Sequence, residues 1–124
     1  MPFRGTATFP LPADATAPGR ARRTLAQLLG SGDARLNAAL LAVSELVTNA
    51  VRHGHRTGAG TIELCVATSA GGLRVSVGSA GPLFEPAPAT LGAAGGWGLG
   101  IVAAVTRAWG VEEGRGTTVV WFEL

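Results

Sequence analysis

The chain has 124 residues, of which 47% are hydrophobic and 15% charged, and this balance excludes a disordered protein. That length is enough for a proper hydrophobic core, so we expect residues 1–124 to form a single domain. The formal net charge of only +2 and the lack of a basic run argue against direct binding of nucleic acid.

Two further features concern covalent structure and location. Cys65 is the single cysteine, which excludes an internal disulfide. The N-terminus has no charged segment followed by a long apolar run, and no apolar stretch approaches the length needed to cross a bilayer. We therefore expect a cytoplasmic protein with no membrane partner.

The first part of the chain predicts a strand followed by two helices. Apolar and polar residues alternate over 3–9, which is the period of a half-buried strand, and residues 10–13 are expected to form a connector. A first helix is expected over 16–29. Asp33 is placed to cap a second helix, whose apolar stripe continues until Gly54 closes it.

The remainder predicts two hairpins separated by a loop and a helix. Residues 61–67 and 73–77 alternate on either side of a glycine pair, whereas 78–96 have no periodicity and predict a long loop. A third helix over 97–109 and strands over 111–113 and 117–124 complete the chain. This order predicts one mixed, mostly antiparallel sheet with helices on one face, a two-layer α/β sandwich.

The second helix carries a carboxylate and a carboxamide four positions apart, Glu45 and Asn49. Four residues advance a helix by roughly 400°, so the two side chains share a face about 6 Å apart. An amide oxygen is a hard ligand that magnesium accepts, and a carboxylate can orient or deprotonate a nucleophile. The alternative is the ordinary polar face of a surface helix.

A glycine-rich segment from Gly95 to Gly100 opens the third helix. Helix N-termini present free N–H groups and a positive dipole end, so this segment could cradle phosphates, although a plain helix-entry loop is the alternative. Together with the Glu45 and Asn49 pair, it points to a nucleotide site.

These motifs resemble those of the GHKL, or Bergerat-fold, ATPase superfamily. The closest resemblance is to bacterial ATP-binding regulators related to anti-sigma-factor serine/threonine kinases. Residues 45–54 match the family's N box nearly residue for residue, the run ending at Gly100 resembles its second glycine box, and residues 116–118 resemble its last Gly-Thr motif. The resemblance covers essentially the whole chain and implies the Bergerat fold, with ATP and Mg²⁺ as cofactors.

The same resemblance implies roles for individual residues. Glu45 would activate the attacking hydroxyl or water, and Asn49 would be the magnesium ligand. The family usually has an aspartate, bonded to the adenine amino group, where this chain has Ser79, and Glu85 in the following loop is a carboxylate that could substitute. The other residues implied at the nucleotide are Arg52, His53, Gly81, Gly96, Gly98, Leu99, Gly100 and, near the floor of the adenine pocket, Thr117.

The resemblance also implies a function and partners. The leading hypothesis is an ATP-dependent protein serine/threonine kinase of the anti-sigma-factor type, with a STAS-type antagonist and a sigma factor as protein partners and a homodimer as a possible state. The alternative is an interaction module that keeps the fold but sequesters a partner without catalysis, which Ser79 favours. The near-neutral charge argues against a third hypothesis, an arginine-rich nucleic-acid binder.

Overall fold

The structure is a computed structural model that describes residues 3–57, 60–69, 71–80, 99–114 and 116–124, with the backbone alone for residues 53–57 and 80. Its elements are, in chain order, β1 (Gly5–Pro12), α1 (Ala17–Leu29), α2 (Leu36–Thr57), β2 (Thr61–Ser69), β3 (Gly72–Ala80), α4 (Leu99–Val105), β4 (Ala108–Gly114) and β5 (Thr117–Glu123). Helix α1 begins after Thr16 and ends at Leu29, and the following Gly30 caps it with a φ of 83°, a conformation that glycine adopts readily.

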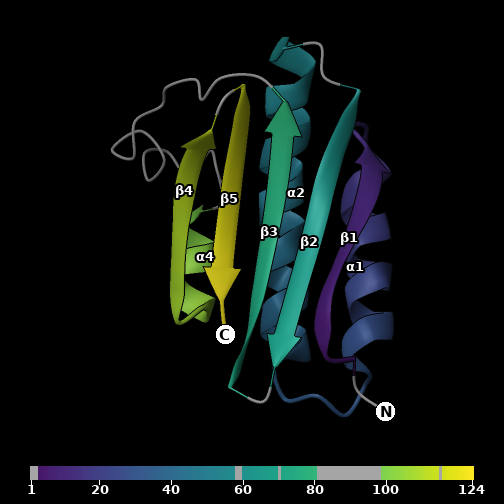
Figure 1. Ribbon diagram of the computed structural model, residues 1–124, viewed down its shortest axis with the longest axis vertical. Coiled ribbons are helices and arrows are strands. Elements are labelled where there is room, and N and C mark those ends of the chain that lie inside the picture. The colour runs from purple at the N-terminus through teal and green to yellow at the C-terminus, as the bar shows by residue number, and fades with distance from the viewer. Residues whose placement is uncertain (1–2, 58–59, 70, 81–98, 115) are drawn as a thin grey trace.

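The strands form one five-stranded sheet in the order β1-β2-β3-β5-β4, and each neighbouring pair is antiparallel. All three labelled helices lie behind this sheet in Figure 1, so they cover one of its faces. The predicted two-layer α/β sandwich with a mostly antiparallel sheet is therefore confirmed. In the described part of the chain, no helix combines the length and hydrophobicity needed to span a bilayer.

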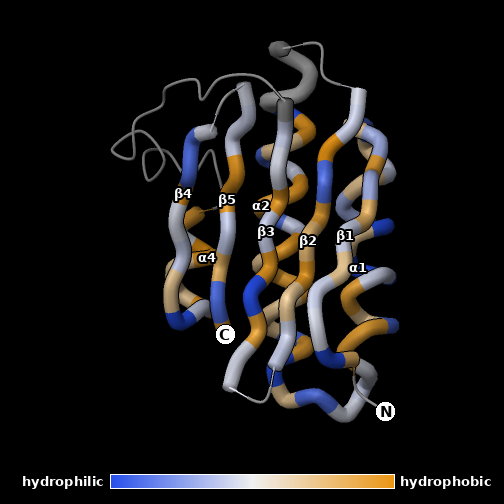
Figure 2. The backbone as a smooth tube through the Cα atoms, viewed as in Figure 1, coloured by the Kyte–Doolittle hydropathy of each residue, from blue (hydrophilic) through white to orange (hydrophobic). Residues whose placement is uncertain are grey.

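The core lies between the sheet and the helices. On β2 the alternate side chains of Ile62, Leu64 and Val66 are buried, because the pleat directs every second residue to the helix layer. Helix α2 packs against these side chains with its own buried apolar residues, which recur every three or four positions and include Val43 and Leu46. Each such side chain contributes roughly 1.5–3 kcal/mol when fully buried. Figure 2 shows this hydrophobic band running through the middle of both layers.

Strand β1 is longer than predicted. Residues 10–13 were expected to form a connector, but Pro10 and Pro12 continue the strand opposite Glu63 and Thr61. An edge strand has one neighbour, so a proline there can direct its missing N–H position away from the sheet. Continuing the strand also buries Leu11, which is 5% exposed.

Helix α2 and strand β3 also run past their predicted ends. Helix α2 continues to Thr57, beyond Gly54, because an interior glycine costs a helix only about 1 kcal/mol. Strand β3 runs to Ala80, three residues into the segment predicted as loop, because β5 pairs with it up to that residue. Pairing with a neighbouring strand satisfies backbone groups that a loop would leave to solvent.

The third predicted helix is shorter than expected. Helix α4 ends at Val105, and Trp109 belongs to β4, where it lies opposite Phe122. The backbone N–H of Arg107 donates to the carbonyl of Glu123 at 2.9 Å, which brings the chain back into the sheet. An indole fits the apolar period of a helix as well as that of a strand, so the pattern alone did not separate the two.

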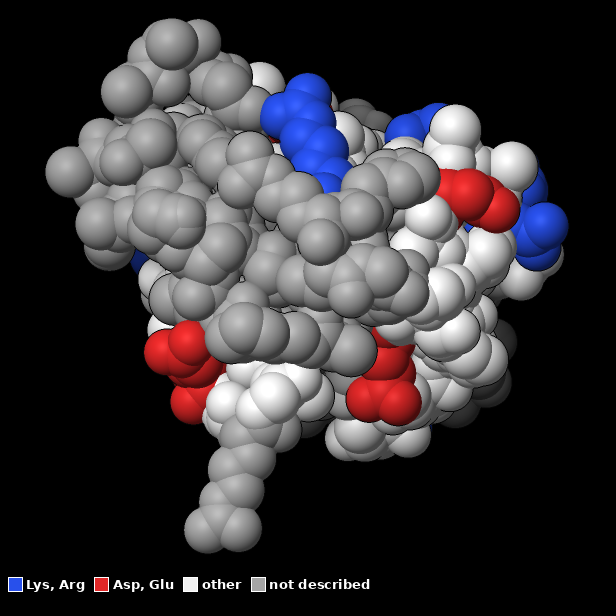
Figure 3. All heavy atoms as spheres, turned by 90° about the horizontal axis from the view of Figure 1, so that it is seen from above, with Lys and Arg blue, Asp and Glu red and all other residues white. Residues whose placement is uncertain are grey.

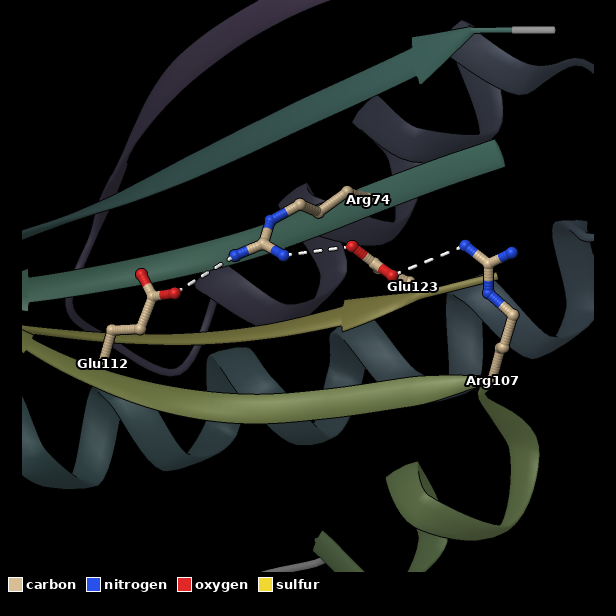
Figure 4. A network of polar contacts seen from close by, with 4 residues as sticks. All are labelled: Arg74, Arg107, Glu112 and Glu123. Carbon is tan, nitrogen blue, oxygen red and sulfur yellow. Dashed lines mark hydrogen bonds and ion pairs between the residues drawn. The ribbon is translucent and has the colours of Figure 1, made fainter. Parts of the chain in front are cut away.

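The sheet face opposite the helices carries a cluster of charges that joins three strands (Figure 4). Arg74 lies 3.1 Å from a carboxylate oxygen of Glu123 and 3.5 Å from one of Glu112, and Arg107 lies 3.4 Å from Glu123. The guanidinium of Arg74 also lies 4.1 Å from the ring centroid of Trp121. Because these groups are partly exposed, each ion pair contributes little to stability.

Candidate functional site

The helix-facing side of the sheet changes from apolar to polar toward one end. Two successive cross-strand rows over β4, β5, β3 and β2 are apolar, Trp109-Phe122-Val75-Val66 and Val111-Val120-Val77-Leu64. The next row reads Glu113-Thr118-Ser79-Ile62. This row, which we call the polar row, lies near the end of β3 and the start of β5.

Two hydroxyl side chains of the polar row are buried. Ser79 is 6% exposed and Thr118 is 4% exposed, and they lie directly opposite each other on β3 and β5. Among the described residues, the Ser79 hydroxyl has no hydrogen-bond partner. A buried polar group without a partner is costly, which makes it a candidate contact for a ligand.

Asn49 is the matching polar group on the helix layer. It is 8% exposed and is the one buried polar side chain in the described part of α2. Its carboxamide forms no hydrogen bond with any described residue. The positions three and seven residues earlier, on the same face, are Leu46 and Ala42, which are buried and apolar, so Asn49 interrupts a hydrophobic stripe.

Glu45 lies one helical turn before Asn49 and is half-buried. Other polar side chains on this part of α2 bond to the helix itself, since Ser44 Oγ donates to the carbonyl of Leu40 and Thr48 Oγ1 to that of Ser44, both at 2.7 Å. Glu45 has no such bond within the described chain. The pair predicted from sequence spacing is therefore the polar pair that α2 leaves available.

The C-terminal half of α2, the end of β3 and the start of β5 meet at the upper end of the molecule in Figure 1. Helix α4 begins on the side that faces this end. Figure 3 views the molecule from this upper end and shows that both acidic and basic side chains are exposed there. Elements that are distant in the sequence, the half of α2 that carries Asn49 and the strand ends that carry the polar row, therefore meet at one end of the fold.

The whole arrangement matches a known family. The family model for the histidine kinase-like ATPase domain matches residues 11–124. The chain belongs to this family. Membership implies that this ATPase domain binds ATP, in agreement with the resemblance seen in the N box.

A solved structure is also similar to this ATPase domain. It contains the RsbU and RsbW domains of Rv1364c from Mycobacterium tuberculosis, and the match has a TM-score of 0.70 at 25% sequence identity. The match covers 95% of this chain and 31% of the other, so this ATPase domain spans about a third of that chain's length. A search of curated proteins found no significant match.

Several predicted nucleotide contacts of the ATPase domain fall on described residues. Arg52 is exposed on α2, one turn beyond Thr48, and takes part in an interaction. Leu99 is 4% exposed and begins α4, and a Cβ built on the next residue, Gly100, would meet no described atom within 4 Å. No described atom therefore occupies the space over Gly100, as a close approach of a ligand would require.

Other predicted contacts lie outside the described residues. His53 belongs to the backbone of α2, but its side chain is not among those described. Gly81, Gly96, Gly98 and Glu85 also lie outside the described residues. Their roles at the nucleotide remain predictions.

Thr118 is a buried hydroxyl of the polar row that the sequence did not single out. The Gly-Thr motif pointed to Thr117, which is exposed and has its Oγ1 3.0 Å from the position of a Cβ on Gly114. Strand alternation from Phe122 through Val120 directs Thr118, not Thr117, to the helix layer. The alternation of residues along β5 is visible in the sequence, but it identifies Thr118 only once the buried face of the strand is known.

A pair of charged side chains with shifted pKa values lies at the other end of α2. The Arg35 side chain bonds to Asp33 at 2.8 Å and lowers the pKa of that carboxyl, with a further bond from the Arg35 backbone N–H. The same contact raises the pKa of Arg35. Asp33 was predicted to cap this helix, and it holds the turn immediately before α2.

A hollow of about 480 Å³ lies at the opposite end of the sheet and is separate from the candidate site. Its lining includes Arg74, Arg107 and Glu123, and none of the predicted site residues. Arg74 contacts Glu112 and Glu123, and Arg107 contacts Glu123, so two carboxylates offset the charge of the two arginines.

Proposed function

We propose that this chain is an ATP-dependent protein serine/threonine kinase that uses Mg²⁺ and acts on a STAS-type protein. The observation that carries the proposal is the buried Asn49 carboxamide, which has no partner among the described residues and lies one turn from Glu45. Family membership and the similarity to a chain with an RsbW domain support the same proposal.

Asn49 fits a metal-binding role on energetic grounds. A buried amide without hydrogen-bond partners lowers the stability of the fold by roughly 1–3 kcal/mol. An asparagine at such a position therefore does not stabilise the helix, and a ligand that bonds to the amide would offset this cost. Mg²⁺ typically keeps several waters and takes one or two protein ligands beside substrate phosphates.

The chemistry divides between ATP, its metal ion and the protein. When bound, Mg²⁺ would neutralise charge on the phosphates of the ATP substrate. Asn49 Oδ1 would hold the ion, and Glu45 would accept the proton of the attacking hydroxyl. The hydroxyl oxygen forms a bond to the γ-phosphorus while the bond from that phosphorus to the ADP oxygen breaks, so the products are a phosphorylated hydroxyl and ADP.

The partners follow from the resemblance of the N box and of the fold to anti-sigma-factor kinases. We propose a small STAS-type domain as the substrate, with a serine or threonine as the acceptor, and a sigma factor as the regulated partner. A cytoplasmic location and a homodimer belong to the same proposal.

Two measurements test this function. Calorimetry should detect ATP binding that depends on Mg²⁺, and a purified STAS-type domain should gain mass by one phosphate when it is incubated with the chain and Mg·ATP. ATP binding without transfer to any STAS-type domain would contradict the kinase assignment while leaving the nucleotide site intact.

A second candidate function has one observation in its favour. Ser79 supplies a hydroxyl where a carboxylate could give a charge-assisted hydrogen bond of roughly twice the strength. A chain with such a weakened site could act as an interaction module that sequesters a partner without catalysis. Absence of any nucleotide binding, with partner binding retained, would favour this second function.

A further inference from the structure

We infer that Ser79 lets the nucleotide site accept guanine as well as adenine, so that GTP binds with an affinity similar to that of ATP. The inference rests on the proposed nucleotide function and deepens it by naming the range of bases. The observations behind it are the buried hydroxyls of the polar row and the adjacent apolar row, which contains Val77 and Val120.

The surroundings of Ser79 suit a purine ring. A base is flat, with apolar faces and a polar edge, so it needs both apolar surface and hydrogen-bonding groups. The row next to Ser79 and Thr118 supplies apolar surface through Val77 and Val120 on the same two strands. Ser79 and Thr118 add hydroxyls at the border of that surface, both more than nine-tenths buried.

The chemistry of the hydroxyl determines the selectivity. Adenine and guanine differ at position 6, where adenine carries an amino donor and guanine a carbonyl acceptor, and guanine carries further donors at positions 1 and 2. An ionised carboxylate can only accept hydrogen bonds, so at position 6 it would pair with the adenine amino group and repel the guanine carbonyl. The hydroxyl of Ser79 rotates and can accept from the amino group or donate to the carbonyl, so it matches either base.

A polar group that pairs with only one of two substrates can give a strong preference for that substrate. A buried polar group that is left unpaired by the wrong substrate can give a 10⁴- to 10⁵-fold preference. Because a hydroxyl finds a bond with both purines, that source of preference is removed at Ser79.

Glu113 is the rival reader of the base. It lies on the polar row opposite Thr118, two strands from Ser79, which places the two Cα atoms about 10 Å apart. It is exposed on an edge strand, in contrast to the buried hydroxyls. A carboxylate that reached the base from there would restore a preference for adenine, so the experiment must include it.

Calorimetry on the wild-type chain with Mg·ATP and Mg·GTP gives the first test. We expect dissociation constants within about 5-fold of each other. The substitution Ser79→Asp should shift the ratio by at least 10-fold toward ATP, because a carboxylate facing position 6 accepts from the adenine amino group and repels the guanine carbonyl. Glu113→Gln is the matched control and should leave both affinities unchanged.

The outcomes separate this inference from the proposed function. A wild-type preference for ATP above about 30-fold would overturn the inference while leaving the kinase proposal in place. Loss of ATP affinity alone in Glu113→Gln would assign base reading to Glu113 and would also overturn it. No binding of either nucleotide would overturn both proposals. Since the wild-type ratio decides, the test holds even where Ser79→Asp fails to fold.

Discussion

The indole of Trp121 lies across Gly110 on the neighbouring strand, with its Cζ2 atom 2.8 Å from the position that a Cβ on residue 110 would occupy. Real Cβ atoms essentially never come so close to another heavy atom, so a larger residue must displace the ring. The ring also supports the guanidinium of Arg74. The small size of Gly110 therefore determines how the open face of the sheet packs.

We expect Gly110→Ala to lower the free energy of unfolding by roughly 1–3 kcal/mol, because overpacking forces Trp121 out of its place. Gly78→Ala is the matched control on the same face, where a Cβ would lie 3.6 Å from Val119 Cγ2, an ordinary contact. Urea denaturation should show a normal midpoint for the control. Equal midpoints for the two variants would mean that the indole moves aside without cost.

The contact between Asp33 and Arg35 predicts a dependence of stability on pH. The folded state holds the pKa of Asp33 below its ordinary value of 3.8, chiefly through the Arg35 side chain. A lowered carboxyl pKa contributes stability that is present above the ordinary value and is lost as pH falls through the lower, folded-state value. Asp33→Asn should therefore be less stable than wild type at pH 7, and the difference should shrink below about pH 4.

Asparagine caps helices about as well as aspartate, so this substitution removes the charge and keeps a cap. Denaturant unfolding at pH 7 and at pH 3 provides the measurement. A difference between the two proteins that stays constant across this range would show that the ionised carboxylate of Asp33 does not stabilise the fold.

The sequence predicted most of the fold because its signals are periodic and local. Alternation over β2 and β3 and the spacing of Glu45 and Asn49 on α2 both survive in the structure. The boundaries were less predictable, since Pro10 is acceptable only on a strand whose outer side is unpaired, and the edge position of β1 depends on the complete sheet.

The candidate site was predictable on the helix and less so on the sheet. Asn49 follows from helical spacing within one segment. Thr118 becomes a candidate only when β5 is known to pair with β3, which places it opposite Ser79. A pairing between segments about 40 residues apart depends on tertiary structure, which no local pattern encodes.

Removal of the Asn49 carboxamide should separate binding from stability. We expect Asn49→Ala to abolish Mg²⁺-dependent ATP binding, because no other described side chain of α2 offers a buried amide. The free energy of unfolding without ligand should change by less than about 1 kcal/mol, since an unsatisfied polar group is lost together with a few packing contacts. Wild type should gain roughly 2.7 kcal/mol at a ligand concentration 100 times the dissociation constant.

Asn37→Ala is the matched control for this experiment, since Asn37 is an exposed asparagine on the same helix. Thermal denaturation with and without Mg·ATP should show ligand stabilisation for the control and none for Asn49→Ala. The same stabilisation in both variants would remove Asn49 from the metal site.

The last prediction concerns Glu45, whose proposed role lies in the chemical step. Glu45→Gln should bind Mg·ATP as wild type does, because the amide keeps the size of the side chain, but phosphoryl transfer should fall roughly 10²- to 10⁴-fold when the general base is removed. Glu63→Gln is the control, since Glu63 is exposed on the face of β2 opposite the helices and should leave transfer unchanged. Single-turnover transfer to the STAS-type acceptor, with nucleotide affinity measured separately, distinguishes the effect on the chemical step from an effect on binding.

Transfer at the wild-type rate in Glu45→Gln would exclude Glu45 as the base. A weaker ATP affinity with an unchanged transfer rate would instead place its carboxylate among the groups that bind the nucleotide.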